Sequence, residues 1–277
     1  MYAFASVLQQ RGAAAQPMDQ SMRIGLLTRL VRNPGWMLGL LCDVAGYGFQ
    51  FVALGHGPIA LVQPLLVSGL LFALPIGAAW AGRKLQPSDW GASVVVCAGL
   101  AVFLSVARPS SGRNDARPFV WVLMLASTAA AAVILVASSR GRGSRQRAVL
   151  LSGAAGIVYG AAAALTKTSS HLLDRGLLRV VDHWQPYMLL VAGIAGMVIA
   201  QSAFQAGSLD VSLPTMSVID PVVSIVIGAL AFRESLSSSS AAIAVEVIAL
   251  AAMSVGVFVL ARSKAMSTIQ KPPPMSN

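Results

Sequence analysis

The stretch Trp36–Pro64 has the sequence WMLGLLCDVAGYGFQFVALGHGPIALVQP, and a faint copy of it lies 150 positions later. That copy, Pro186–Pro214, has the sequence PYMLLVAGIAGMVIAQSAFQAGSLDVSLP. Matching positions are Ala45-Gly46 with Ala195-Gly196, Ala53 with Ala203, Gly57 with Gly207 and Pro64 with Pro214. Paired repeats of membrane helices, each with a proline-interrupted span at the same place, are typical of secondary transporters. The stretch therefore predicts a membrane protein built from two similar halves.

The composition excludes an ordinary soluble domain. Of the 277 residues, 56% are hydrophobic and 11% are charged, whereas soluble domains average about 25% charged residues. Membrane spans of about 20 apolar residues account for this composition. The formal net charge of +10 comes from basic residues between the apolar runs, so it predicts contact with anionic lipid headgroups and not with nucleic acid. Cys42 and Cys97 lie inside apolar runs, where they predict packing and neither a disulfide nor a metal site.

Eight apolar runs are long enough to cross a bilayer. They cover residues 36–54, 59–81, 89–107, 118–138, 148–166, 186–206, 212–232 and 240–261. A further fragment, Met1–Leu8, is too short to cross, which fits either a shortened first helix or a native start upstream of Met1. The predicted fold class is therefore all-α: a polytopic membrane protein of about nine transmembrane helices, the first one truncated, in two inverted four-helix repeats.

The order of the spans divides the chain into four parts. Residues 1–108 form the first helical repeat, 109–146 a polar link with a central fifth span, 147–262 the second repeat, and 263–277 a disordered cytoplasmic tail. Five spans separate equivalent helices, and this odd number inverts the second repeat, an arrangement that permits alternating access. Between the first two spans, Gln20–Asn33 fits an interfacial amphipathic helix and a basic loop equally well.

The basic residues predict the orientation of the chain. Thirteen of the twenty lysines and arginines lie in connections that share a side with the C-terminal tail, and seven lie on the other side. Connections rich in lysine and arginine tend to stay in the cytoplasm. We therefore expect the N-terminus outside and the C-terminus inside, in a bacterial cell membrane.

Two carboxylates within apolar spans are the main candidates for a substrate site, because a charge at mid-bilayer costs at least a few kcal/mol unless it faces a cavity or a partner. Asp43 in the second span and Asp220 in the eighth each lie roughly 11 Å from the cytoplasmic end. Together they could share a proton or a cation, or hold a cationic substrate. The alternative is local: each caps a helix break or bonds a neighbouring Ser or Tyr. Tyr47, one turn from Asp43, joins the candidate site, where it either holds the Asp43 carboxylate or lines the same cavity.

Amide groups and prolines add to this candidate site. The buried amides are expected at Gln50, Gln63, Gln201 and Gln205. Gln63-Pro64 and Asp220-Pro221 mark two places where a helix is expected to open, because proline frees backbone carbonyls. Such groups suit a polar solute or a partly dehydrated ion, and the alternative is hydrogen bonding between helices. Lys167, at a predicted span end, either snorkels to the interface or borders the central cavity.

The sequence contains no catalytic motif of the common kinds. It lacks GxSxG, HExxH, a Walker loop and a GxGxxG before a helix, and its three histidines have no ligand spacing. We therefore expect no enzyme activity and no cofactor. The lack of a nucleotide-binding loop also argues against a nucleotide-driven pump on this chain.

Three segments carry a resemblance to a known family. They are Trp36–Pro64, which ends in the run Gly57–Pro64; Gln201 with the following Leu209-Asp210; and Phe232-Arg233-Glu234. They resemble the drug/metabolite transporter superfamily with its EamA-type repeats, and within it the nine-span NIPA-like magnesium transporters. The resemblance implies a nine- or ten-helix transporter with a central cavity between the halves and solute exchange without nucleotide.

One departure from the NIPA-like pattern concerns the second span. Where that pattern has a glutamate this sequence has Tyr47, with Asp43 one turn earlier, and Gln50 stands at the position of an asparagine. The departure weakens the case for magnesium as the substrate.

Three interpretations of function follow. The first is a secondary transporter of a small polar or cationic metabolite, with proton coupling through Asp43 and Asp220. The second is a divalent-cation transporter, for which two carboxylates are few, although Mg²⁺ often keeps its waters. The third is a membrane scaffold that transports nothing, because a first helix too short to span would leave the cavity unsealed. The sequence leaves a homodimer open.

Overall fold

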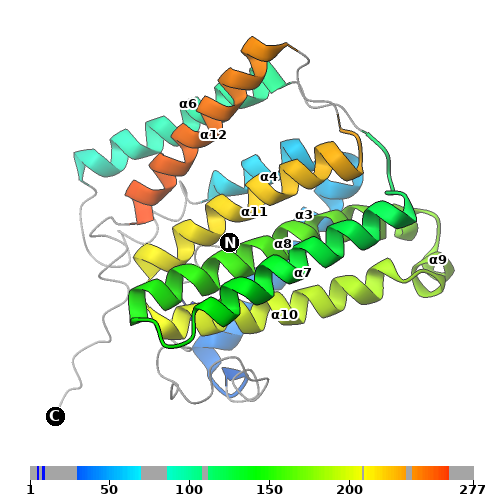
Figure 1. The fold of residues 1–277 in the computed structure, drawn as a ribbon, viewed down its shortest axis with the longest axis horizontal. Coiled ribbons are helices and arrows are strands. Elements are labelled where there is room, and N and C mark those ends of the chain that lie inside the picture. The colour runs from blue at the N-terminus through cyan, green and yellow to red at the C-terminus, as the bar shows by residue number, and fades with distance from the viewer. Residues whose placement is uncertain are drawn as a thin grey trace.

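The computed structural model describes residues 5, 8–9, 30–69, 86–107, 112–207, 209–234 and 239–261. Within these ranges the regular structure is entirely helical (Figure 1). The helices are α3 (Pro34–His56), α4 (Ile59–Val67), α6 (Pro87–Ala107), α7 (Pro118–Ser138), α8 (Ser144–Asp174), α9 (Leu177–Asp182), α10 (Gln185–Ala206), α11 (Leu209–Ala231) and α12 (Ser240–Ala261).

Seven of these helices, all except α4 and α9, are long and apolar enough to cross a membrane. They coincide with seven of the eight predicted spans, so the prediction of an all-helical, multi-pass membrane protein is confirmed for the described residues. The predicted span 59–81 begins as α4, and its remainder lies outside the described residues, as do most of Met1–Leu8 and Gln20–Asn33 and all of the tail 263–277. The count of nine helices and the inverted repeats remain predictions.

Proline and asparagine fix where several helices begin. The side chain of Asn33 accepts a hydrogen bond from the backbone N–H of Trp36 at 3.1 Å and caps α3. Proline occupies the first turn of α3, α7 and α10. There its missing N–H costs nothing, because the first N–H groups of a helix have no partner within the helix.

The long helix α8 is the centre of the bundle and packs against α10, α11, α7 and α3 (Figure 1). Its small residues allow this close approach, which drives helix association in lipid. A Cβ atom at Gly156 would lie 3.0 Å from the Cβ of Ile219 on α11, and one at Gly160 would lie 2.8 Å from the Cβ of Val223. Against α10 the roles are reversed: the glycine, Gly196, lies on α10, and the ring of Tyr159 on α8 packs against it.

Contacts between the helices fix their relative directions. Helices α3, α8 and α11 run in one direction, and α10 runs in the other. The facing pairs are Tyr47 with Thr166, Gly55 with Ser170, Gly153 with Ile219, Gly160 with Val223, Gly196 with Tyr159 and Gly207 with Ala148. This alternation matches the order of the predicted spans along the chain.

Two helix pairs that correspond in the sequence repeat pack antiparallel. The start of α4 meets the end of α11, where Ile59 lies against Gly228, and Val67 lies beside Ser217 nearer the start of α11. Helices α6 and α12 cross each other on the side of α4 and α11 that faces away from α8 (Figure 1). Gly99 of α6 faces Met253, and Gly256 of α12 faces Val96, so these helices also run in opposite directions.

The α6–α12 contact depends on glycine. A Cβ at Gly99 would lie 2.6 Å from Met253 Cγ and 3.0 Å from the carbonyl oxygen of Ala249. We expect Gly99→Leu to destabilise the protein by about 1–3 kcal/mol through overpacking, measured as a lower thermal unfolding temperature in detergent. Gly91→Leu is the matched control, because a Cβ at Gly91 on the same helix meets nothing within 4 Å. Equal losses in the two variants would contradict this account of the packing.

Candidate functional site

A chain of four polar side chains crosses the interface between α3 and α10. The indole N–H of Trp36 donates to Gln201 Oε1 at 3.2 Å, and Gln201 Nε2 donates to Gln9 Oε1 at 2.6 Å. Gln9 Nε2 in turn donates to Asp43 Oδ2 at 2.5 Å. The structure thus brings together two predicted site residues, Asp43 and Gln201, and places Gln9 of the N-terminal segment between them.

The second carboxylate, Asp220, lies on α11 where this helix meets α8. Its Oδ1 accepts a hydrogen bond from Ser224 one turn later at 3.1 Å. A Cβ atom at Gly156 would lie 3.3 Å from the backbone nitrogen of Asp220, and one at Gly160 would lie 3.1 Å from its carbonyl oxygen. Asp220 therefore lies against the turn of α8 that carries Tyr159.

Both carboxylates lie well inside their helices. Asp43 is nine residues from the start of α3, and Asp220 is eleven residues from the start of α11. At about 1.5 Å per residue these positions are about 14 and 16.5 Å into their helices, near the middle of each 23-residue helix.

Tyr47 does not bond the carboxylate one turn before it. Its hydroxyl makes a 2.7 Å hydrogen bond with Thr166 on α8. The local interpretation of Tyr47 as a partner of Asp43 is therefore wrong, and Tyr47 instead ties α3 to the central helix.

Lys167 forms a buried ion pair instead of snorkelling. Helix α8 continues eight residues past the predicted span end at 166, to Asp174. Lys167 Nζ lies 2.5 Å from Glu234 Oε1, and both side chains are buried. Glu234 also accepts the backbone N–H groups of Ile59 and Ala60 at 2.8 and 3.0 Å. The carboxylate thus caps α4, whose own N-cap residue, Pro58, supplies no side-chain cap.

Aromatic rings close this end of the bundle around the ion pair. Lys167 Nζ lies 5.3 Å from the ring centroid of Phe232, within the range of a cation–π contact. Phe232 packs edge-on against Trp121, which packs edge-on against Trp184. Because these rings come from three separate segments, they join the end of α11 to the starts of α7 and α10.

The remaining predicted amides lie on three helices. Gln63 is buried on α4, and its Nε2 has no hydrogen-bond partner among the described residues. Gln205 is buried on α10 one turn after Gln201, and Gln50 is partly buried on α3.

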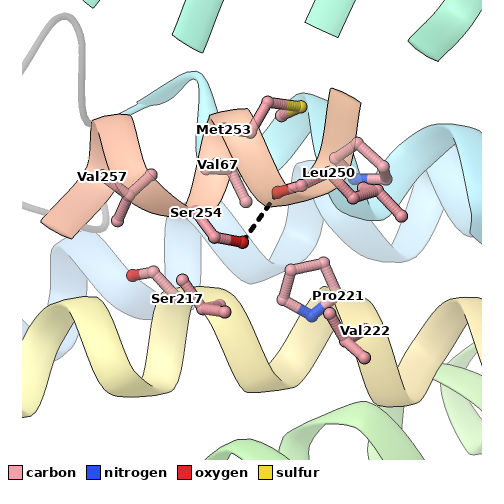
Figure 2. Close-up of a pocket in the computed structure, with 10 residues that line it drawn as sticks. Val67, Ser217, Pro221, Val222, Leu250, Met253, Ser254 and Val257 are labelled. Atoms are coloured by element: carbon pink, nitrogen blue, oxygen red, sulfur yellow. Dashed lines mark hydrogen bonds between the residues drawn. The ribbon is translucent and has the colours of Figure 1, made fainter. Parts of the chain in front are cut away.

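The prediction that helices open at Pro64 and Pro221 is wrong. Pro64 lies inside α4, and Pro214 and Pro221 lie inside α11, which continues through both. Neighbouring helices allow proline within a membrane helix by surrounding the freed carbonyl with protein. Figure 2 shows this setting: α12 covers the turn of α11 that holds Ser217 and Pro221.

A cavity of about 20 Å³ lies between α4, α11 and α12 beside these prolines (Figure 2). Ser217, Pro221 and Ser254 are among its lining residues, and Ser254 already donates to the carbonyl of Leu250 at 2.7 Å. This volume has room for about one water molecule, whereas small-molecule sites measure about 300–1,000 Å³. In this conformation the cavity does not hold a metabolite.

Metal-ligating side chains do not gather in the described part of the chain. Within those ranges no three His, Cys, Asp or Glu residues are placed so that they could hold one ion.

Sequence reasoning missed three participants in these contacts. Gln9 directly follows the apolar fragment Met1–Leu8, and nothing in the local sequence marks its amide as part of a site. Glu234 lies 67 positions from Lys167, too far for any local pattern to connect them. The signal for Thr166 was present: the five polar residues 166–170 interrupt an apolar helix, and all five are buried.

Comparisons with known proteins give one similar chain. A protein of Corynebacterium glutamicum described as uncharacterized is 28% identical over 235 residues, which cover 84% of this chain and 81% of that protein. No family model matches the chain, and no solved structure matches it. The description of that relative names no activity.

We expect the stability of the protein to depend on the buried Lys167–Glu234 pair. Lys167→Met leaves a buried carboxylate without its cation, and we expect a loss of about 3–5 kcal/mol. Lys167→Met/Glu234→Gln should be more stable than Lys167→Met alone, because the neutral amide needs no cation and still offers an oxygen to α4. Thermal unfolding in detergent would measure both. A double variant less stable than the single one would contradict a charge-based role for the pair.

Proposed function

We propose that this chain is a secondary transporter that moves a small polar or cationic metabolite along a path between its two halves, with Asp43 and Asp220 on that path. The observation that carries the proposal is the placement of these two carboxylates. They lie near the middle of two different membrane-length helices, α3 and α11, and both helices pack against the central helix α8.

The partners of these carboxylates support a cationic ligand. Each accepts a hydrogen bond from a neutral side chain, Gln9 or Ser224. Among the described residues the ion pairs are Lys167–Glu234 and His171–Asp174, so neither Asp43 nor Asp220 has a basic partner there. An intramembrane carboxylate without such a partner is a candidate for binding a cation or a proton.

The antiparallel packing of corresponding helices supports the transport mechanism. Helices α4 and α11, and α6 and α12, occupy matching places in the sequence repeat and run in opposite directions. Two halves related in this way can expose a site between them to one side of the membrane and then to the other. We also propose that the chain belongs to the drug/metabolite transporter superfamily that its sequence resembles, and that its N-terminus lies outside the cell.

Ligand-dependent stability tests this proposal. Purified protein in detergent would be heated with a panel of organic cations, amino acids, nucleosides and divalent cations. A compound at 100 times its dissociation constant should stabilise the wild type by about 2.7 kcal/mol. We expect one class of compound to raise the unfolding temperature, and Asp43→Asn and Asp220→Asn each to abolish that shift while remaining folded.

The matched control is Asp174→Asn, which removes an exposed carboxylate at the end of α8 and should keep the shift. Stabilisation by Mg²⁺ alone would favour a divalent-cation transporter. A folded protein that responds to none of the compounds would favour the scaffold interpretation. A shift that survives both Asp43→Asn and Asp220→Asn would place the site elsewhere.

A further inference from the structure

We infer that Gln9 is a positioning residue for Asp43, and that the chain from Trp36 through Gln201 and Gln9 presents the Asp43 carboxylate with a hydrogen-bond donor of fixed direction. The importance of Asp43 for transport rests on the proposed function, whereas the direction of the chain rests on hydrogen-bond chemistry alone. A short N-terminal segment is thereby part of the site.

The direction of the chain starts at the indole. The Nε1–H of Trp36 can only donate, so Gln201 must turn its Oε1 toward it, at 3.2 Å. The Nε2 of Gln201 then faces Gln9 and donates to its Oε1 at 2.6 Å. Gln9 is left with its Nε2 toward Asp43 Oδ2, at 2.5 Å. An ionised carboxylate only accepts, so every link of the chain is complementary.

Burial makes this direction hard to reverse. Trp36 and Gln201 are each 1% exposed and Gln9 is 3% exposed, so water does not compete for these groups. If both amides turned over, the Nε2 of Gln201 would face the donor of Trp36, and two buried donors would lose their acceptors. An unsatisfied buried donor costs about 1–3 kcal/mol, which holds the chain in one orientation.

A glycine on α3 brings the N-terminal segment close enough to form the chain. A Cβ atom at Gly39 would lie 3.0 Å from the carbonyl oxygen of Ala5 and 3.1 Å from Gln9 Cγ. Gly39 lies one turn before Asp43, so the absence of a side chain there lets Gln9 reach the carboxylate. Leu8 also packs against this glycine, because its Cβ would lie 3.1 Å from a Cβ atom at Gly39.

The donor from Gln9 favours the charged form of Asp43, because a hydrogen bond to a carboxylate stabilises its ionised state. The other titratable groups near Asp43 are Tyr47 on its own helix and, across the interface, Tyr159 on α8 with Asp220 on α11 beyond it. The amino group of Met1 lies outside the described residues. A carboxylate that is held in one orientation binds a cation without first rearranging, which lowers the cost of binding.

Infrared spectroscopy of the full-length protein in lipid, without any ligand, tests this inference. The C=O stretch of a protonated carboxyl group would be followed during a pH titration, and the contribution of Asp43 would be the band lost in Asp43→Asn. We expect this band to persist to a pH about one unit higher in Gln9→Leu than in the wild type. Trp36→Phe, which leaves Gln9 in place, should shift the band in the same direction by less.

Trp121→Phe is the matched control, because it removes an indole N–H that donates to Asp115 at 2.8 Å, away from Asp43. It should leave the band of Asp43 unchanged. An Asp43 band with the same pH dependence in the wild type, Gln9→Leu and Trp36→Phe would overturn the inference. Because the measurement needs no substrate, a failure to find a transported compound would count against the proposed function and not against the role of Gln9.

Discussion

Close packing around the central helix α8 is the constraint on which the rest of the structure depends. In lipid, burying apolar surface does not draw helices together, so association requires contacts between small residues and a few polar bonds. Helix α8 supplies both. Gly156 and Gly160 admit the side chains of α11, Tyr159 fits against Gly196 of α10, and Thr166 and Lys167 bond to partners outside α8. The helix is surrounded on all sides at the level of residues 166–170, where five consecutive residues are buried.

The ionisable side chains inside the bundle form two kinds of arrangement. At one end of the bundle, Lys167 and Glu234 neutralise each other, and the carboxylate also completes the first turn of α4. Near the middle of α3 and α11, Asp43 and Asp220 have only neutral donors among the described residues. In the first arrangement the two opposite charges neutralise each other, and the pair links α8 to Glu234 and the start of α4. In the second, no basic side chain of the described residues pairs with either carboxylate, and intramembrane carboxylates of this kind are candidates for function.

The sequence was sufficient to predict the membrane class and seven helices, because hydropathy measures the property that places a helix in lipid. It was less successful where polar residues are buried against protein. The predicted span 148–166 stopped eight residues short of the end of α8, because a hydropathy pattern cannot distinguish a lysine paired inside the bundle from one exposed at an interface. Gln9 was missed for a related reason: its role depends on Gln201, 192 positions away.

The cap on α4 also has a consequence for the order in which the protein is made. The N–H groups of Ile59 and Ala60 are satisfied by Glu234, which follows them by 175 and 174 positions. When α4 leaves the ribosome, the residue that completes its first turn has not yet been synthesised. These two N–H groups therefore gain the partner they have in the folded protein only after most of the second half of the chain has been made.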